Sequence, residues 1–277
     1  MANVVSIVLL AFLAAAYRRG VNELWRRRGV GAFVPAWRML AFTIGIVSLI
    51  AVQLPAVEGL AQGSLTGHMA QHMILLLLAG PLLAAGAAGL PLALSVPVSL
   101  RRRLAGARAR PVARWLRRPV ILAVVAAAAH AAVVWAWHLP SLYMLALTNS
   151  SAHVAEHASF VAAAWLLWSL VLGRAPHRLA GPVAFLLLFA TMMPASALAA
   201  VFTFAPTTIY PVEVVAAQGG DPLIDQQLAG LVMWVPMDVA VLTVGTAVLL
   251  RWLRQLERTM PSGQNLVPQG GPAQTGP

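Results

Sequence analysis

Apolar residues gather into long runs along this chain, and short segments rich in arginine, glycine or proline separate them. Each run is long enough to cross the hydrocarbon core of a bilayer as a helix, which takes roughly 17–25 residues. The pattern predicts an all-α fold, a polytopic membrane bundle of seven transmembrane helices. We place these helices at residues 1–17, 36–55, 65–86, 119–138, 153–172, 181–204 and 227–250.

The apolar runs leave no stretch long enough for a separate soluble domain. We therefore expect a single transmembrane domain over residues 1–258. The segment 259–277 is rich in glycine, proline and glutamine and has no hydrophobic periodicity, which predicts a disordered cytoplasmic tail.

The overall composition indicates that lipid is the solvent of this protein. Hydrophobic residues make up 60% of the chain and charged residues 10%, and the mean hydropathy is +0.79. A soluble protein of this length could not bury so much apolar surface. The absence of cysteine excludes disulfides and thiolate metal ligands, so a soft metal would need His, Met or carboxylate ligands.

The basic residues mark one side of the predicted membrane. All 19 are arginines, and they lie in the segments 18–38, 101–118, 174–178 and 251–258. These segments are alternate connections between the apolar runs, so the positive-inside rule places them in the cytoplasm. We expect the N-terminus outside and the C-terminus in the cytoplasm. The net charge of +11 is thereby explained without a nucleic-acid partner.

Five of the seven histidines fall at helix ends on the predicted outer side. His68 and His72 are four residues apart, as are His153 and His157, so each pair places two imidazoles on one helix face. His138 ends a third helix at the same side. Histidine is costly inside a bilayer and usually marks function there. We predict a metal site, for which imidazole ligands suit copper, zinc, iron or nickel.

Several neighbouring side chains are candidates for the same site. Glu156 precedes His157 and could orient an imidazole or bind the metal directly. Met69 and Met73 carry thioethers, which favour Cu(I), although ordinary packing is the simpler explanation of both. Asp225 is expected to cap the seventh helix, and its carboxylate on the outer side is a further candidate ligand.

Two polar residues lie deeper in the predicted bundle. His130 is within an alanine run of the fourth helix, and Asp238 is midway along the seventh. An intramembrane acid normally faces the bundle interior and has a partner. Because the two residues have similar predicted depths, we expect a contact between them, with no role assigned.

The motifs of common hydrolytic enzymes are missing. Neither histidine pair has the His-Glu-x-x-His sequence of a zinc protease, and the chain has no cysteine and no Gly-x-Ser-x-Gly elbow. We therefore expect metal binding without catalysis.

The stretches that carry these residues resemble a known family, the multi-spanning CtaG-type cytochrome c oxidase assembly factors of bacteria. The resemblance covers about residues 36–250 in family order. It is carried by His68-Met-Ala-Gln-His72, Trp137-His138-Leu-Pro140, His153-Val-Ala-Glu156-His157 and Asp225-Gln-Gln-Leu-Ala-Gly230. The resemblance implies a non-enzymatic protein of the bacterial cytoplasmic (inner) membrane that helps deliver copper to the subunits of a haem–copper oxidase in the same membrane.

Three functions remain in order of preference. In the first, His68, His72, His153 and His157 bind copper at the outer face and pass it to the oxidase. The second is a haem-binding membrane oxidoreductase, with histidines on opposite helices as axial ligands. The third is a metal or proton transporter that uses His130 and Asp238. Zinc or haem could replace copper as the bound group.

Overall fold

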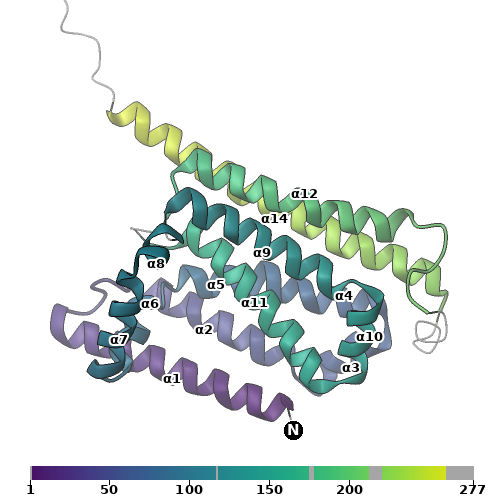
Figure 1. Cartoon of the computed structure of the whole chain (residues 1–277), viewed down its shortest axis with the longest axis horizontal. Helices are drawn as coiled ribbons and strands as arrows, with labels where there is room; N and C mark the ends of the chain where they lie inside the picture. Colours follow the sequence, from purple (N-terminus) through teal and green to yellow (C-terminus); the bar gives the residue numbers. More distant parts are fainter. Residues whose placement is uncertain (1, 117, 175–177, 212–219, 260–277) are drawn as a thin grey trace, which may run out of the picture.

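Helices form over each long apolar run, and short connections join them (Figure 1). The computed structural model describes residues 2–116, 118–174, 178–211 and 220–259, and all regular structure within them is helical. The long elements are α1 (Ala2–Arg28), α2 (Ala36–Ala51), α9 (Pro119–Trp137), α11 (Ser150–Leu172), α12 (Gly181–Phe204) and α14 (Pro222–Thr259). The short elements are α3 (Pro55–Gly63), α4 (Leu65–Met73), the π-helix η1 (Ile74–Ala79), α5 (Gly80–Ala85), α6 (Gly89–Ser95), α7 (Val98–Ala109), α8 (Pro111–Leu116) and α10 (Pro140–Thr148).

Within the described residues, six helical segments are long and apolar enough to cross a membrane, with α4, η1 and α5 counted as one. There are seven if α2 and α3 form one bent span. The prediction of an all-α polytopic bundle is confirmed. The bend of 60° between α2 and α3 was not expected, because the sequence suggested one helix over 36–55. Pro55 explains it: proline lacks an N–H, restricts the residue before it, and therefore begins a new helix at α3.

The last helix is longer than expected. α14 begins at Pro222 rather than at residue 227 and continues for 38 residues. It ends at Thr259, next to the predicted domain boundary. The predicted disordered tail beyond it lies outside the described residues.

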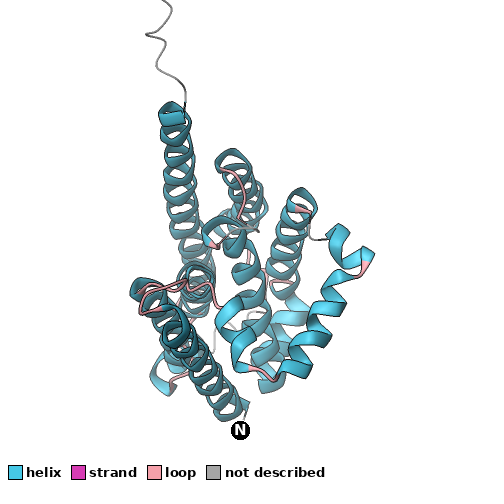
Figure 2. Ribbon diagram, turned by 90° about the vertical axis from the view of Figure 1, so that its left-hand side faces the viewer, coloured by secondary structure: helices cyan, strands magenta, loops and turns pink. Residues whose placement is uncertain are grey.

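The bundle has two chemically different ends (Figure 1). The starts of α4, α11 and α14 and the end of α9 meet beside α3 and α10, and we call this the histidine end. The short helices α6, α7 and α8 lie with the C-terminal half of α1 at the opposite, arginine end, which faces the viewer in Figure 2. Between these ends, α12 and α14 pair along one side, and α1 lies on the other.

Two glycines allow the helices around the histidines to approach closely. A Cβ atom at Gly67 would lie 2.3 Å from the carbonyl oxygen of Leu60, which joins α4 to α3. A Cβ at Gly80 would lie 2.5 Å from the Cβ of Ala164, which joins α5 to α11. Side chains at either position would force these elements apart. Gly67 therefore sets how close α4 comes to α3, and Gly80 sets how close α5 comes to α11.

The expected helix over 65–86 is interrupted directly after its histidines. Ile74–Ala79 form a π-helix, in which the N–H of Gly80 bonds to the carbonyl of Leu75. Pro81 follows in α5 and cannot donate the α-helical bond to Leu77. The wider turn accommodates that missing donor. Such π segments are frequent at functional sites.

Candidate metal centre

All five histidines of the predicted outer group lie in one cluster at the histidine end. His68 and His72 come from α4, His153 and His157 from α11, and His138 follows the last residue of α9. The imidazole centroids are 4.4 Å apart within the first pair and 4.2 Å apart within the second. Between helices, the centroid distances are 6.0 Å for His68–His153, 5.6 Å for His72–His157 and 6.1 Å for His72–His138.

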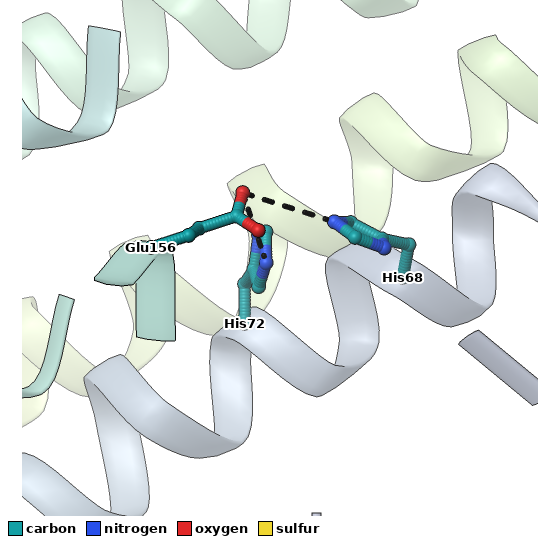
Figure 3. Close-up of side chains that lie close together, drawn as sticks. All are labelled: His68, His72 and Glu156. Atoms are coloured by element: carbon teal, nitrogen blue, oxygen red, sulfur yellow. Dashed lines mark ion pairs between the residues drawn. The ribbon is translucent and has the colours of Figure 1, made fainter. Parts of the chain in front are cut away.

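Glu156 is the carboxylate of this cluster. It is fully buried (0% exposed) on α11 and points at the histidines of α4 (Figure 3). Its Oε1 atom lies 3.5 Å from Nε2 of His72 and 3.9 Å from Nε2 of His68. Two groups of possible ligands share this residue, His68–His72–Glu156 and His153–Glu156–His157. Within each group the ligand atoms lie within 4.8 Å of one another, which is compatible with a common ion.

The cluster contains several buried polar atoms without a hydrogen-bond partner. They are Nε2 of His68, both ring nitrogens of His72, Nε2 of His157 and both carboxylate oxygens of Glu156. Each unpaired buried polar group costs about 1–3 kcal/mol, and more when it is charged. So many orphaned donors and acceptors in one place are expected where a bound ion completes the structure.

His138 pairs with Met69 at the deeper edge of the cluster. Its Nδ1 lies 2.6 Å from the carbonyl oxygen of Val134, which can only accept, so Nδ1 carries the proton. In the neutral ring, Nε2 then presents a lone pair, and it faces the Sδ atom of Met69 at 3.3 Å. Two soft electron-pair donors thus point at each other. Met69 and Met73 both pack in the hydrophobic core, and the sulfur of Met69 also contacts His138 of the cluster.

Two tyrosines form the wall behind His68 and His138. Tyr143 and Tyr210 stack with ring centroids 4.1 Å apart, and Tyr143 meets His68 edge-on at 5.4 Å. The hydroxyl of Tyr210 donates a hydrogen bond to the carbonyl of His138 at 3.1 Å. Burial raises the pKa of both tyrosines above the usual value near 10, so both stay protonated.

Asp225 has a different role from the one that the sequence suggested. Asp221 caps α14 instead, since its Oδ1 accepts from the N–H groups of Leu223 and Ile224. The Asp225 carboxylate reaches across to α4, where it accepts from the backbone of Leu65 at 2.7 Å and of Thr66 at 3.1 Å. The Thr66 hydroxyl also donates to it. The prediction of a cap on the seventh helix was wrong because the acid satisfies another helix start, that of α4, which carries His68 and His72.

Glu58 is a residue of the cluster that sequence reasoning missed. Its Oε1 lies 3.4 Å from Nδ1 of His153, and its Oε2 accepts from the side chain of Gln71 at 3.3 Å. Gln71 also donates to the carbonyl of Val52 at 2.7 Å, which ties α4 to the end of α2. An acid between two apolar runs on the histidine side was an available signal. Because helix α3 was not predicted, the sequence alone did not show that Glu58 lies next to the histidines.

The expected contact between His130 and Asp238 is not formed. The Asp238 carboxylate accepts from the Ser196 hydroxyl at 2.7 Å and from Nε1 of Trp234 at 2.8 Å. His130 is buried, and its Nδ1 has no hydrogen-bond partner in the structure. Similar predicted depth in the membrane did not predict a contact, because the side chains of His130 on α9 and Asp238 on α14 face different neighbours.

The fold and this cluster together define a class: a polytopic membrane protein that buries imidazole, carboxylate and thioether ligands at one end of its helical bundle. A family model described as "Cytochrome c oxidase caa3 assembly factor (Caa3_CtaG)" matches residues 15–255. The chain belongs to this family of cytochrome c oxidase caa3 assembly factors. Comparisons with curated proteins and with solved structures gave no match.

Proposed function

We propose that this oxidase assembly factor binds copper in the histidine cluster and delivers it to oxidase subunits in the same membrane. Copper is then the cargo of the protein, and the protein a carrier rather than an enzyme. The main support is the group of orphaned ligand atoms around Glu156, which includes two buried histidines of α4. The arginine distribution supports an orientation with the histidine end outside, and we propose the bacterial inner membrane as the location.

The ligand chemistry favours copper over harder ions. Imidazole binds copper, zinc, iron and nickel, and thioether selects Cu(I) among them. The lone pairs of His138 and Met69 face each other at 3.3 Å, which suits a soft cation beside them. Hard ions such as magnesium and calcium prefer several oxygen ligands. Among the residues that the structure describes, only Glu156 and Glu58 place carboxylate oxygens next to the clustered histidines.

The two ligand groups also support a direction of transfer. His153 and Glu58 are partly exposed and line a cavity, whereas His68 and His72 are buried. A copper ion that first meets the α11 group can pass to the α4 group while Glu156 remains a common ligand. Because Glu156 belongs to both groups, the ion would keep at least one ligand while it moves from the α11 group to the α4 group. The orphaned Nε2 of His157 lies on this route.

A metal titration of the purified full-length protein tests this proposal. The double variant His72→Ala/His157→Ala removes one imidazole from each group and is expected to lose at least half of the bound copper. His130→Gln is the matched control, because it changes a buried histidine outside the cluster. Copper is quantified by elemental analysis after dialysis. An unchanged copper content in the double variant contradicts the proposal.

Two alternatives make different predictions in the same preparation. A haem-binding oxidoreductase would show a Soret band, and a colourless protein that binds copper contradicts it. A transporter through His130 and Asp238 has lost its structural basis, since the two residues have separate surroundings.

A further inference from the structure

A strongly basic cavity lies at the arginine end of the bundle, far from the histidines. It has a volume of about 680 Å³ and lies between the C-terminal half of α1 and the junction of α6 and α7. Its charged lining consists of Arg18, Arg19, Glu23, Arg26, Arg27 and Arg101. Five guanidinium groups against one carboxylate leave four positive charges. Glu23 pairs only with Arg26 and Arg27, so it leaves the other three without an acidic partner in this cavity.

An apolar cavity of about 590 Å³ adjoins this basic one. It is lined mostly by aliphatic side chains of α1, α2, α6 and α11, such as Leu10, Leu13, Leu49 and Val161. Arg108 of α7 and the two histidines of α11, His153 and His157, also line it. This mostly aliphatic lining suits hydrocarbon chains.

The two cavities meet at the junction of α6 and α7. Val96 lines both. On α7, Arg101, Leu104 and Arg108 are spaced i, i+3 and i+7, so they share one helix face. On that face, Arg101 lines the basic cavity, whereas Leu104 and Arg108 line the apolar cavity. A bound molecule that spans both therefore needs an anionic group next to an apolar chain.

We propose that these joined cavities bind one anionic phospholipid, with its phosphate among the arginines and its acyl chains in the apolar cavity. Basic pockets between transmembrane helices are known to bind acidic lipid headgroups. A free phosphate would leave the apolar cavity unused, and a neutral lipid would bring no net negative charge to a basic cavity with four excess positive charges. The basic cavity is separate from the histidine cluster, whereas the apolar cavity is also lined by Glu58, His153 and His157 of that cluster.

Close backbone packing fixes the position of α1, which carries four of the cavity's arginines, against α6. A Cβ atom at Gly20 would lie 1.9 Å from the carbonyl oxygen of Pro91, so α1 packs directly on the backbone of α6. This contact joins the two elements that form the basic cavity. The packing of α1 on α6 therefore fixes the helices that border the basic cavity, and the four arginine side chains of α1 that line it are exposed.

Lipid binding to the full-length protein, measured by native mass spectrometry from detergent micelles, tests the charge requirement. We compare phosphatidylglycerol with phosphatidylcholine of the same acyl chains. Each arginine near an anionic lipid contributes a factor of about five in affinity, so Arg19→Gln/Arg101→Gln should weaken phosphatidylglycerol binding about 25-fold. Arg102→Gln/Arg103→Gln removes the same charge from residues that line neither cavity, and should bind like the wild type.

A second pair of variants tests the acyl-chain position. Ala162 lines the apolar cavity, and Ala162→Trp should fill it and reduce binding of phosphatidylglycerol without changing the charge. Ala11→Trp places the same ring on an exposed alanine of α1 that lines neither cavity. Equal binding of both lipids, equal loss in both arginine variants, or full competition by inorganic phosphate at the same ionic strength overturns the proposal.

Discussion

At the scale of single residues, Glu156 decides the properties of the cluster. A carboxylate with no exposed surface and no hydrogen-bond partner is costly to bury without a cation. The buried Glu156 carboxylate should therefore destabilise the metal-free protein and favour the binding of a cation. Stability and copper affinity are expected to change in opposite directions when this charge is removed.

Glu156→Gln tests this opposition directly. The variant keeps the shape of the side chain but removes the buried charge, so the metal-free protein should gain about 1–3 kcal/mol in stability. Copper should bind more weakly and stabilise the variant less than the wild type. Thermal unfolding with a chelator and with added copper measures both effects. Glu257→Gln, on the exposed end of α14, is the control and should change neither.

Residue patterns identified part of the cluster but not its partners. The His-x-x-x-His spacing and the helix ends suggested that five histidines lie together, and they do. The bond from Asp225 to the start of α4 joins residues about 160 positions apart, and no local pattern specifies it. Hydrophobic periodicity likewise gave the depth of His130 and Asp238 but not the neighbours that their side chains face.

At the scale of elements, close helix packing places the ligands. α11 carries both Glu156 and His157, and it approaches α5 where Gly80 meets Ala164. The sequence predicted the long helices because their apolar runs are continuous. It did not predict the π-helix or α3, since both arise from single prolines and from packing rather than from periodicity.

Exchanging the two small residues tests this contact. Gly80→Ala should push α11 away, cost about 1–3 kcal/mol through overpacking, and weaken copper binding. The double variant Gly80→Ala/Ala164→Gly restores the space and should recover both stability and binding. Unfolding and copper titration of the three proteins measure the coupling. If the double variant is no better than Gly80→Ala, close packing of α5 on α11 does not control the site.

At the scale of the whole molecule, the two ends of the bundle differ in charge and in ligands. The positive-inside rule predicts that the arginine end faces the cytoplasm, and labelling can test this orientation. Because the chain has no cysteine, one introduced thiol is a unique reporter.

Single cysteines at the two ends should react differently in intact cells. Ser151→Cys lies at the start of α11 at the histidine end, and Arg258→Cys at the end of α14. A membrane-impermeant maleimide is expected to label the first in whole cells and both after lysis. The reverse pattern would place the histidine cluster in the cytoplasm and remove the proposed route for copper from outside.

The ligand set also determines how this protein responds to oxidants. Thiolate sites must be kept reduced before they can bind a metal, because a disulfide has no free ligand. Imidazole and carboxylate have no such requirement, and Met69 loses its thioether only by oxidation to the sulfoxide. The copper carrier that we propose would therefore need no thiol reductant to keep its imidazole and carboxylate groups able to bind.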